Sequence, residues 1–277
     1  ERRALEGVRM DCHAFWKLLS VPSPDAAELL ARRPTLPELR LPAELRDHPA
    51  RDVPPVLVVP LPHLGGDCAA ALHELRAHVL ASDDRTIAEW HETAFSFLAR
   101  RQGKTTWLER SGGSLAYVDC LSDSWRDARY IHIYRDGVAC AWSMAHHPYF
   151  RVRVARAAAR AAVPIRECLE EHLPVELFGA YWSAVMMRGL RALRRVPRGD
   201  VLHISYEKLT TDPTEVLRRV QRFMDGTEAA QEWTAAARGC IRPPAPVARP
   251  ARETERLRRA CRPGMSELAR LEADVTN

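Results

Sequence analysis

The 277-residue sequence has little lysine, no closely paired cysteines and no long apolar run. No apolar segment approaches the roughly 18 residues that a membrane helix needs, and the start at residues 1–5 is not that of a signal peptide. The seven cysteines show no CxxC pair and no Cys/His zinc spacing, which favours reduced thiols. We therefore expect a soluble, cytoplasmic protein that spans no membrane.

The scarcity of lysine leaves the positive charge almost entirely to arginine. Of the 41 basic residues only Lys17, Lys104 and Lys208 are lysines, and the formal net charge is +5. A GC-rich coding sequence explains most of this bias, although the planar guanidinium also suits phosphate and sulfate. A net charge of +5 over a mixed-sign surface is too weak to indicate nucleic acid as a partner.

The aromatic and apolar content excludes a mainly disordered chain. Seven Trp, six Tyr and six Phe stand in a sequence that is 46% hydrophobic, enough to build one substantial core. We expect a single domain over residues 1–277, with its core at about 56–225. Residues 1–55 are expected to be helical or irregular, and residues 226–277 form an Arg/Pro-rich C-terminal segment. The proline density between residues 238 and 262 argues against a long helix there.

Strands alternate with helices through the middle of the chain. The predicted strands cover residues 56–59, 105–110, 130–134 and 201–206, and the predicted helices cover residues 67–79, 86–101, 115–122, 138–145, 174–195 and 214–224. This alternation predicts an α/β fold with a mostly parallel central sheet flanked by helices. In such a sheet, ligands bind beyond the carboxyl ends of the strands, where helix N-termini converge.

Polar side chains follow three of these strands. Arg135 ends one strand and Ser143 lies on the next helix, so both could bind one anionic group such as a phosphate. Arg110 and Ser111 open a Gly-rich exit, and Tyr206 ends another strand, where its ring could stack on a planar ligand. Each has a structural alternative: a guanidinium paired with a nearby carboxylate, an ordinary tight turn, or a half-buried tyrosine.

Three segments together resemble the bacterial, actinobacterial-type sulfotransferases that use 3′-phosphoadenosine 5′-phosphosulfate. They are Trp-Leu-Glu-Arg-Ser-Gly-Gly-Ser at 107–114, Tyr-Ile-His-Ile-Tyr-Arg-Asp-Gly-Val-Ala-Cys-Ala-Trp-Ser at 130–143, and Val-Leu-His-Ile-Ser-Tyr-Glu-Lys-Leu at 201–209 with Asp-Pro at 212–213. The resemblance implies a P-loop-like, three-layer α/β fold. It also implies transfer of a sulfuryl group from this nucleotide to a hydroxyl or amine of a small molecule, without a metal.

The resemblance also implies roles for individual residues. Arg135 and Ser143 would bind the 3′-phosphate, and Tyr206 would contact the adenine. Arg110, with Ser111, would lie near the 5′-phosphosulfate, where its charge could stabilise the bridging oxygen as the bond breaks. The product would be 3′-phosphoadenosine 5′-phosphate.

One element of the family pattern is missing from the sequence. A strand followed by a Gly-rich loop with Arg and Ser/Thr should hold the 5′-phosphosulfate near the N-terminus, and the nearest segment, residues 59–67, has no Arg or Lys. We expect that segment to be structural and the true loop to precede Glu1; without such a loop, transferase activity would be doubtful. The general base stays open among His147, Glu109 and His91.

Two other functions remain open. A non-catalytic nucleotide-binding or scaffold protein of the same fold would have kept the strands and lost the loop. A nucleotide kinase of related fold would prefer ATP with Mg²⁺ to the phosphosulfate.

Overall fold

A computed structural model of the chain describes residues 7–10, 68–81, 87–110, 113–159, 173–227, 231–243 and 247–276. By their internal contacts the residues divide into two compact units, residues 1–127 and residues 128–277. Each unit is described by itself. The predicted strand at 56–59 lies outside the described residues.

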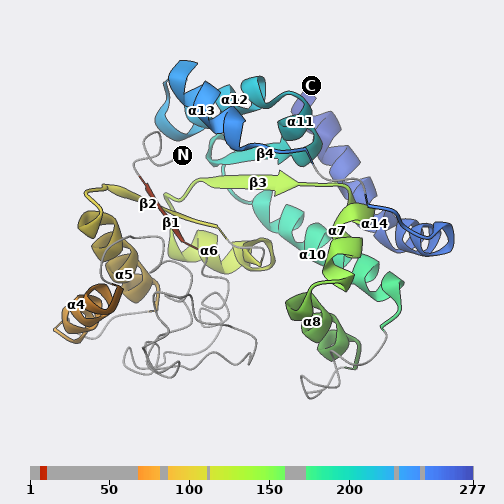
Figure 1. Ribbon diagram of the computed structural model, residues 1–277, viewed down its shortest axis with the longest axis horizontal. Helices are drawn as coiled ribbons and strands as arrows, with labels where there is room; N and C mark the ends of the chain where they lie inside the picture. The colour runs from red at the N-terminus through yellow and green to blue at the C-terminus, as the bar shows by residue number, and fades with distance from the viewer. Residues whose placement is uncertain are drawn as a thin grey trace. The chain divides into compact units, whose positions relative to one another are not determined.

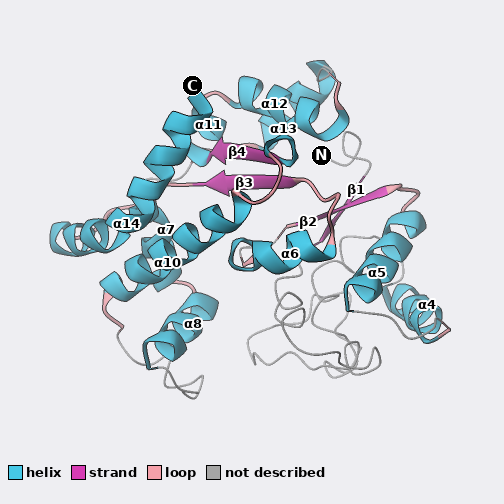
Figure 2. Ribbon diagram, turned by 180° about the vertical axis from the view of Figure 1, so that it is seen from behind, coloured by secondary structure: helices cyan, strands magenta, loops and turns pink. Residues whose placement is uncertain are grey.

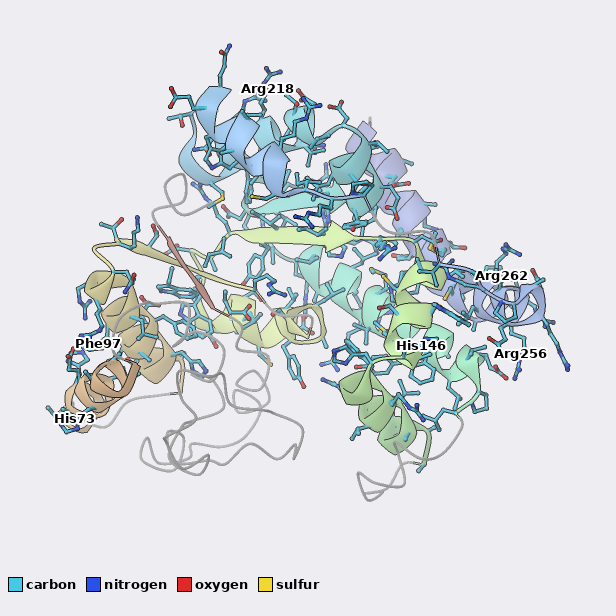
Figure 3. The ribbon with its side chains drawn as sticks, viewed as in Figure 1. His73, Phe97, His146, Arg218, Arg256 and Arg262 are labelled. Atoms are coloured by element: carbon cyan, nitrogen blue, oxygen red, sulfur yellow. The ribbon has the colours of Figure 1, made fainter. Side chains whose placement is uncertain are left out.

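The first unit contains a two-stranded parallel sheet and helices. Strand β1 pairs with β2 in a register that runs from Gly7 opposite Thr106 to Met10 opposite Glu109. Its described elements are β1 (Gly7–Met10), α4 (Cys68–Leu80), α5 (Ile87–Arg101), β2 (Thr106–Glu109), the 3₁₀ helix η3 (Ser114–Tyr117) and α6 (Val118–Ser124). Helices α4 and α5 contact each other, and Figure 3 labels His73 on α4 and Phe97 on α5.

Aromatic rings fill the core of the first unit beside α5. Phe95 is 1% exposed and lies 4.8 Å from the ring of Trp107 on β2, measured between centroids. Glu92 accepts hydrogen bonds from the indole N–H groups of Trp107 and Trp125, each at 3.2 Å. One carboxylate therefore satisfies two indole donors and fixes α5 against β2 and α6.

The second unit also contains one two-stranded parallel sheet, surrounded by helices. Strands β3 and β4 lie side by side and point the same way (Figures 1 and 2), with Tyr130 opposite Val201 and Tyr134 opposite Ser205. Its described elements are β3 (Tyr130–Tyr134), α7 (Gly137–Ala145), α8 (Pro148–Ala159), α10 (Val175–Leu193), the 3₁₀ helix η4 (Arg198–Asp200), β4 (Val201–Ser205), α11 (Tyr206–Thr211), α12 (Pro213–Asp225), α13 (Gln231–Cys240) and α14 (Ala251–Thr276).

Glycines let the helices of the second unit approach one another closely. A Cβ atom added at Gly179 of α10 would lie 2.8 Å from the Cβ of Ala260 on α14. The ring of Trp182 fits between Gly137 and Gly264, where an added Cβ would lie 2.5 Å and 2.7 Å from it. Helix α10 is therefore packed against both α7 and α14, and α7 is the helix that begins at the end of β3.

The α/β fold class with parallel strands is confirmed, and the predicted helices and strands at 67–145 and 174–224 match within a few residues. Tyr206 is the first residue of α11 and not the last of a strand. Among the described residues no helix is both long and apolar enough to cross a membrane.

Two expectations about the ends of the chain are wrong. Residues 1–55 contain a strand of four residues, β1. The C-terminal segment forms a helix of 26 residues, α14, although its proline density argued against one. The prolines at 243–250 all precede this helix, and Pro263 alone lies inside it. Whether residues 1–277 fold as one domain stays a prediction.

Candidate functional site

The end of β3 turns directly into α7. Asp136 is the N-cap of that helix, and its carboxylate accepts a hydrogen bond from the backbone N–H of Ala139 at 2.8 Å. The N–H of Gly137 points to the sulfur of Met265 on α14, at 3.3 Å. Arg135 lies between the last strand residue and this cap, partly exposed.

The end of β4 turns into α11 in the same way. The Ser205 hydroxyl caps α11 by accepting from the N–H of Lys208 at 3.3 Å. Because Tyr134 and Ser205 are opposite each other in the parallel register, the next residues, Arg135 and Tyr206, leave the sheet side by side. The guanidinium carbon of Arg135 lies 4.9 Å from the centroid of the Tyr206 ring, a cation–π contact.

A single carboxylate joins the two strand exits. Glu207 accepts from the N–H of Asp136 through Oε1 and from the Ser205 hydroxyl through Oε2, both at 3.0 Å. Within the described part of the chain, Arg135 makes no salt bridge with this or any other carboxylate. Among the described carboxylates, none therefore forms the ion pair with Arg135 that the structural alternative required.

A cleft of about 170 Å³ opens beside these exits. Residues 134–136 and Glu207 line it on one side, and α14 lines the other with Met265, Leu268, Ala269 and Glu272. The hydroxyl of Tyr134 donates to Glu272 at 2.8 Å. Burial first, and then this bond, raise the pKa of Tyr134 well above its usual range, so the phenol keeps its proton.

Most of the first backbone N–H groups of α7 have partners inside the protein. Those of residues 136, 137 and 139 bond to Glu207, Met265 and Asp136, respectively. We expected ligands to bind where helix amides converge, but these amides already have acceptors. An anion at this strand exit would therefore depend on side chains, above all on Arg135.

Two further candidates lie on or after α7. Ser143 is exposed near the C-terminal end of the helix, six residues after Gly137, which corresponds to about 9 Å along the axis. His147 is exposed between α7 and α8, with its ring 5.6 Å from that of Phe150. Figure 3 labels the preceding residue, His146, whose ring nitrogen bonds to the carbonyl of Trp142 at 2.8 Å.

The remaining candidates belong to the first unit. Arg110 is exposed at the end of β2, and Ser111 lies outside the described residues. Glu109 accepts from the Ser114 hydroxyl at 2.9 Å. His91 is 0% exposed and lies among Phe95 and Trp125, so its burial argues against a role as a base toward an acceptor.

The model of the sulfotransferase family matches residues 22–229, about three quarters of the chain. The chain belongs to the sulfotransferase family. Membership supports sulfuryl transfer as the general activity, and it agrees with the α/β fold class predicted from the sequence.

The crystal structure of a sulfotransferase from Mycobacterium avium is similar over 94% of this chain and 69% of that chain, at 18% sequence identity and a TM-score of 0.46. No curated protein matches the sequence significantly. In the described part of this family member, no three His, Cys, Asp or Glu side chains group closely enough to hold a metal ion.

Sequence reasoning missed one interaction of this sulfotransferase-family site. Glu207 follows Tyr206 within the segment that resembles the family, but we gave it no role. Its contact with Asp136 joins residues 71 apart in sequence. Only the pairing of β3 with β4 brings them together, so no local pattern could have indicated the bond.

Two histidines lie inside the sheet, behind the strand exits of this family member. His132 of β3 and His203 of β4 are register partners, and their Nδ1 atoms are 3.1 Å apart. Burial first, and then the neighbouring His203, lower the pKa of His132 to about 3. Burial also lowers the pKa of His203. One ring therefore donates to the other while both are neutral.

Proposed function

We propose that this member of the sulfotransferase family transfers a sulfuryl group from 3′-phosphoadenosine 5′-phosphosulfate to a hydroxyl or amine of a small-molecule acceptor. The family match supports the general reaction. The observation that carries the choice of nucleotide is the contact between Arg135 and Tyr206 at adjacent strand exits. A guanidinium that makes no salt bridge with the described residues and lies beside an aromatic ring suits a phosphate next to a planar base.

The proposed roles are those that the resemblance to the family implies. Arg135 binds the 3′-phosphate with a charge-assisted hydrogen bond, and Ser143 adds a hydroxyl from α7. Tyr206 contacts the adenine. In the first unit, Arg110 with Ser111 binds near the 5′-phosphosulfate. The general base stays unassigned: His147 and Glu109 are the candidates, and the burial of His91 argues against it.

The bound nucleotide would supply the activated sulfuryl group. The protein's own part is to position it and to keep positive charge where negative charge develops. Arg135 keeps its charge for the ligand because the nearby carboxylates are used elsewhere: Asp136 caps α7, Glu207 joins the exits, and Glu272 accepts from Tyr134. Each of these bonds reduces the competition that a phosphate would meet.

We propose a cytoplasmic location and no partner beyond the nucleotide and the acceptor. Four cysteines whose side chains the structure describes, Cys120, Cys140, Cys240 and Cys261, are free thiols, as in a reducing compartment. Neither the net charge of +5 nor the described helices suggest nucleic acid or a membrane as a partner.

Calorimetric titration with 3′-phosphoadenosine 5′-phosphate tests the nucleotide site directly. We expect Arg135→Ala to weaken binding about 10- to 100-fold, because a charge-assisted bond to phosphate is lost. Arg135→Lys should recover part of the affinity. Arg262→Ala, which removes an exposed arginine of α14 (Figure 3), is the matched control and should bind like the wild type.

A wild-type chain that does not bind this nucleotide would contradict the proposal, and tighter binding of ATP with Mg²⁺ would favour the kinase. Turnover of labelled phosphosulfate with a panel of hydroxylated and amine acceptors then tests catalysis. Binding without turnover on any acceptor would favour the non-catalytic alternative.

A further inference from the structure

Glu207 uses both of its carboxylate oxygens to connect two segments of the chain. One oxygen accepts from the main chain at the end of β3, at Asp136, and the other accepts from Ser205 at the end of β4. Asp136 follows Arg135, and Glu207 itself follows Tyr206. The two residues proposed to hold the nucleotide therefore each neighbour a residue that Glu207 binds: Arg135 precedes Asp136, and Tyr206 follows Ser205.

We infer that Glu207 is a positioning residue for nucleotide binding: it locks the two strand exits together and so keeps the Arg135 guanidinium over the Tyr206 ring. This inference rests on the proposed nucleotide site. Glu207 itself need not touch the ligand.

The lock acts on the main chain and not on the arginine side chain. The N–H of Asp136 belongs to the peptide that joins it to Arg135, so the bond from Glu207 restricts rotation of that peptide. If the bond is lost, the exit can turn, and the 4.9 Å contact between Arg135 and Tyr206 must be formed again each time ligand binds. Ordering the exit on binding lowers affinity, which is the general cost of a site that is not preorganised.

Two substitutions of Glu207 separate the effect of side-chain length from the effect of its negative charge. Glu207→Gln keeps the length and a carbonyl acceptor for the Asp136 N–H but loses the charge. Glu207→Asp keeps the charge but is one methylene shorter, so it cannot reach both donors. We expect the Gln variant to bind 3′-phosphoadenosine 5′-phosphate within about threefold of the wild type, and the Asp variant to bind about tenfold more weakly.

Glu272→Gln is the matched control. Glu272 lines the same cleft but bonds to the Tyr134 hydroxyl and not to a main-chain N–H of the strand exits. Its neutralisation removes the same charge beside Arg135 while leaving the lock intact. Equal weakening by Glu207→Asp and Glu272→Gln, or a Gln variant at position 207 as weak as the Asp variant, would overturn the inference.

Hydrogen exchange of the Asp136 amide in the nucleotide-free protein gives a second readout. We expect it to be faster in Glu207→Asp than in the wild type and in Glu207→Gln. Unchanged exchange in the Asp variant would overturn the lock even if binding changed. If the wild type binds no nucleotide but the exchange difference is found, the lock stands and the proposed nucleotide site fails.

Discussion

His132 and His203 form a hydrogen-bonded pair of neutral imidazoles, and His132 is buried. Their Nδ1 atoms are 3.1 Å apart, and His132 is 8% exposed. Of the carboxylates near these strands, Glu207 joins the strand exits and Glu272 is bonded to Tyr134. A proton added to this neutral pair would create a charge in a buried site, and burial disfavours the charged form, so the folded state resists it.

This pair predicts that stability falls in mild acid. The unfolded histidines take up protons near pH 6.5, whereas the folded His132 does so only near its pKa of about 3. The stability that His132 contributes is present above pH 6.5 and is lost as the pH falls, by about 2 kcal/mol between pH 7 and pH 5.

Urea unfolding at pH 7 and pH 5 measures this effect. His132→Leu should flatten the dependence by about the same 2 kcal/mol, whatever its effect at pH 7. His73→Gln, which replaces an exposed histidine of α4, is the matched control. An unchanged slope in the His132 variant would show that the acid sensitivity arises elsewhere.

The sequence predicted the positions of single site residues, but not the contacts between residues far apart in the chain. Arg135 and Tyr206 each come directly after a strand, so local pattern alone placed them at the strand exits. Their contact with each other and the bond of Glu207 to Asp136 require the register of two strands 71 residues apart. No local sequence pattern predicts the register of these two strands.

At the scale of elements, α14 is the main departure from expectation. Leu257, Cys261, Leu268 and Leu271 recur with helical spacing and are all buried, and this pattern outweighs the single internal proline, Pro263. An interior proline costs a helix about 3 kcal/mol in an exposed setting. The apolar face, and not the local proline content, should have decided the prediction.

Helix α10 supplies the polar group that makes this proline tolerable. The Ser183 hydroxyl donates to the carbonyl of Ala260 at 2.9 Å and accepts from the N–H of Gly264 at 3.4 Å. These two main-chain groups would bond to each other in an ideal α-helix. A side chain from the neighbouring helix therefore inserts into the turn at Pro263, a recognised cause of helix distortion.

The close approach of α10 to α14 predicts the effect of a single methyl group. Gly179→Ala should lower the free energy of unfolding by about 1–2 kcal/mol, since the clash with Ala260 outweighs the gain in helix propensity. Gly199→Ala, in η4, meets nothing within 4 Å and should be close to neutral. Urea denaturation compares the two, and an equal effect on both would contradict the packing argument.

At the scale of the whole molecule, alternation of strands and helices was enough to predict the fold class. Strands bounded by turn residues and helices with one apolar face are local patterns, and most of them were located within a few residues. Strand β1 was missed because four residues, Gly-Val-Arg-Met, carry too little pattern. It is fixed by its partner β2, about 100 residues later.

The cysteines predict a graded reactivity across the molecule. Burial raises the pKa of Cys140 to about 11 and that of Cys261 to about 12, whereas Cys240 is exposed. Because only the thiolate reacts, labelling by iodoacetamide at pH 8 should modify Cys240 at least about 100-fold faster than Cys261. Peptide mapping over time measures the rates, with urea-unfolded protein as the control in which they converge. Similar rates in the folded protein would contradict the burial of Cys261.

The internally bonded start of α7 has a consequence for how this protein can change over evolutionary time. Main-chain amides are the same whatever the sequence, so a ligand held by them is hard to exchange for another by mutation. Here those amides already serve Glu207, Met265 and Asp136. The choice of anion is then left to side chains such as Arg135, and a lineage could acquire a different nucleotide preference through a few substitutions without rebuilding the fold.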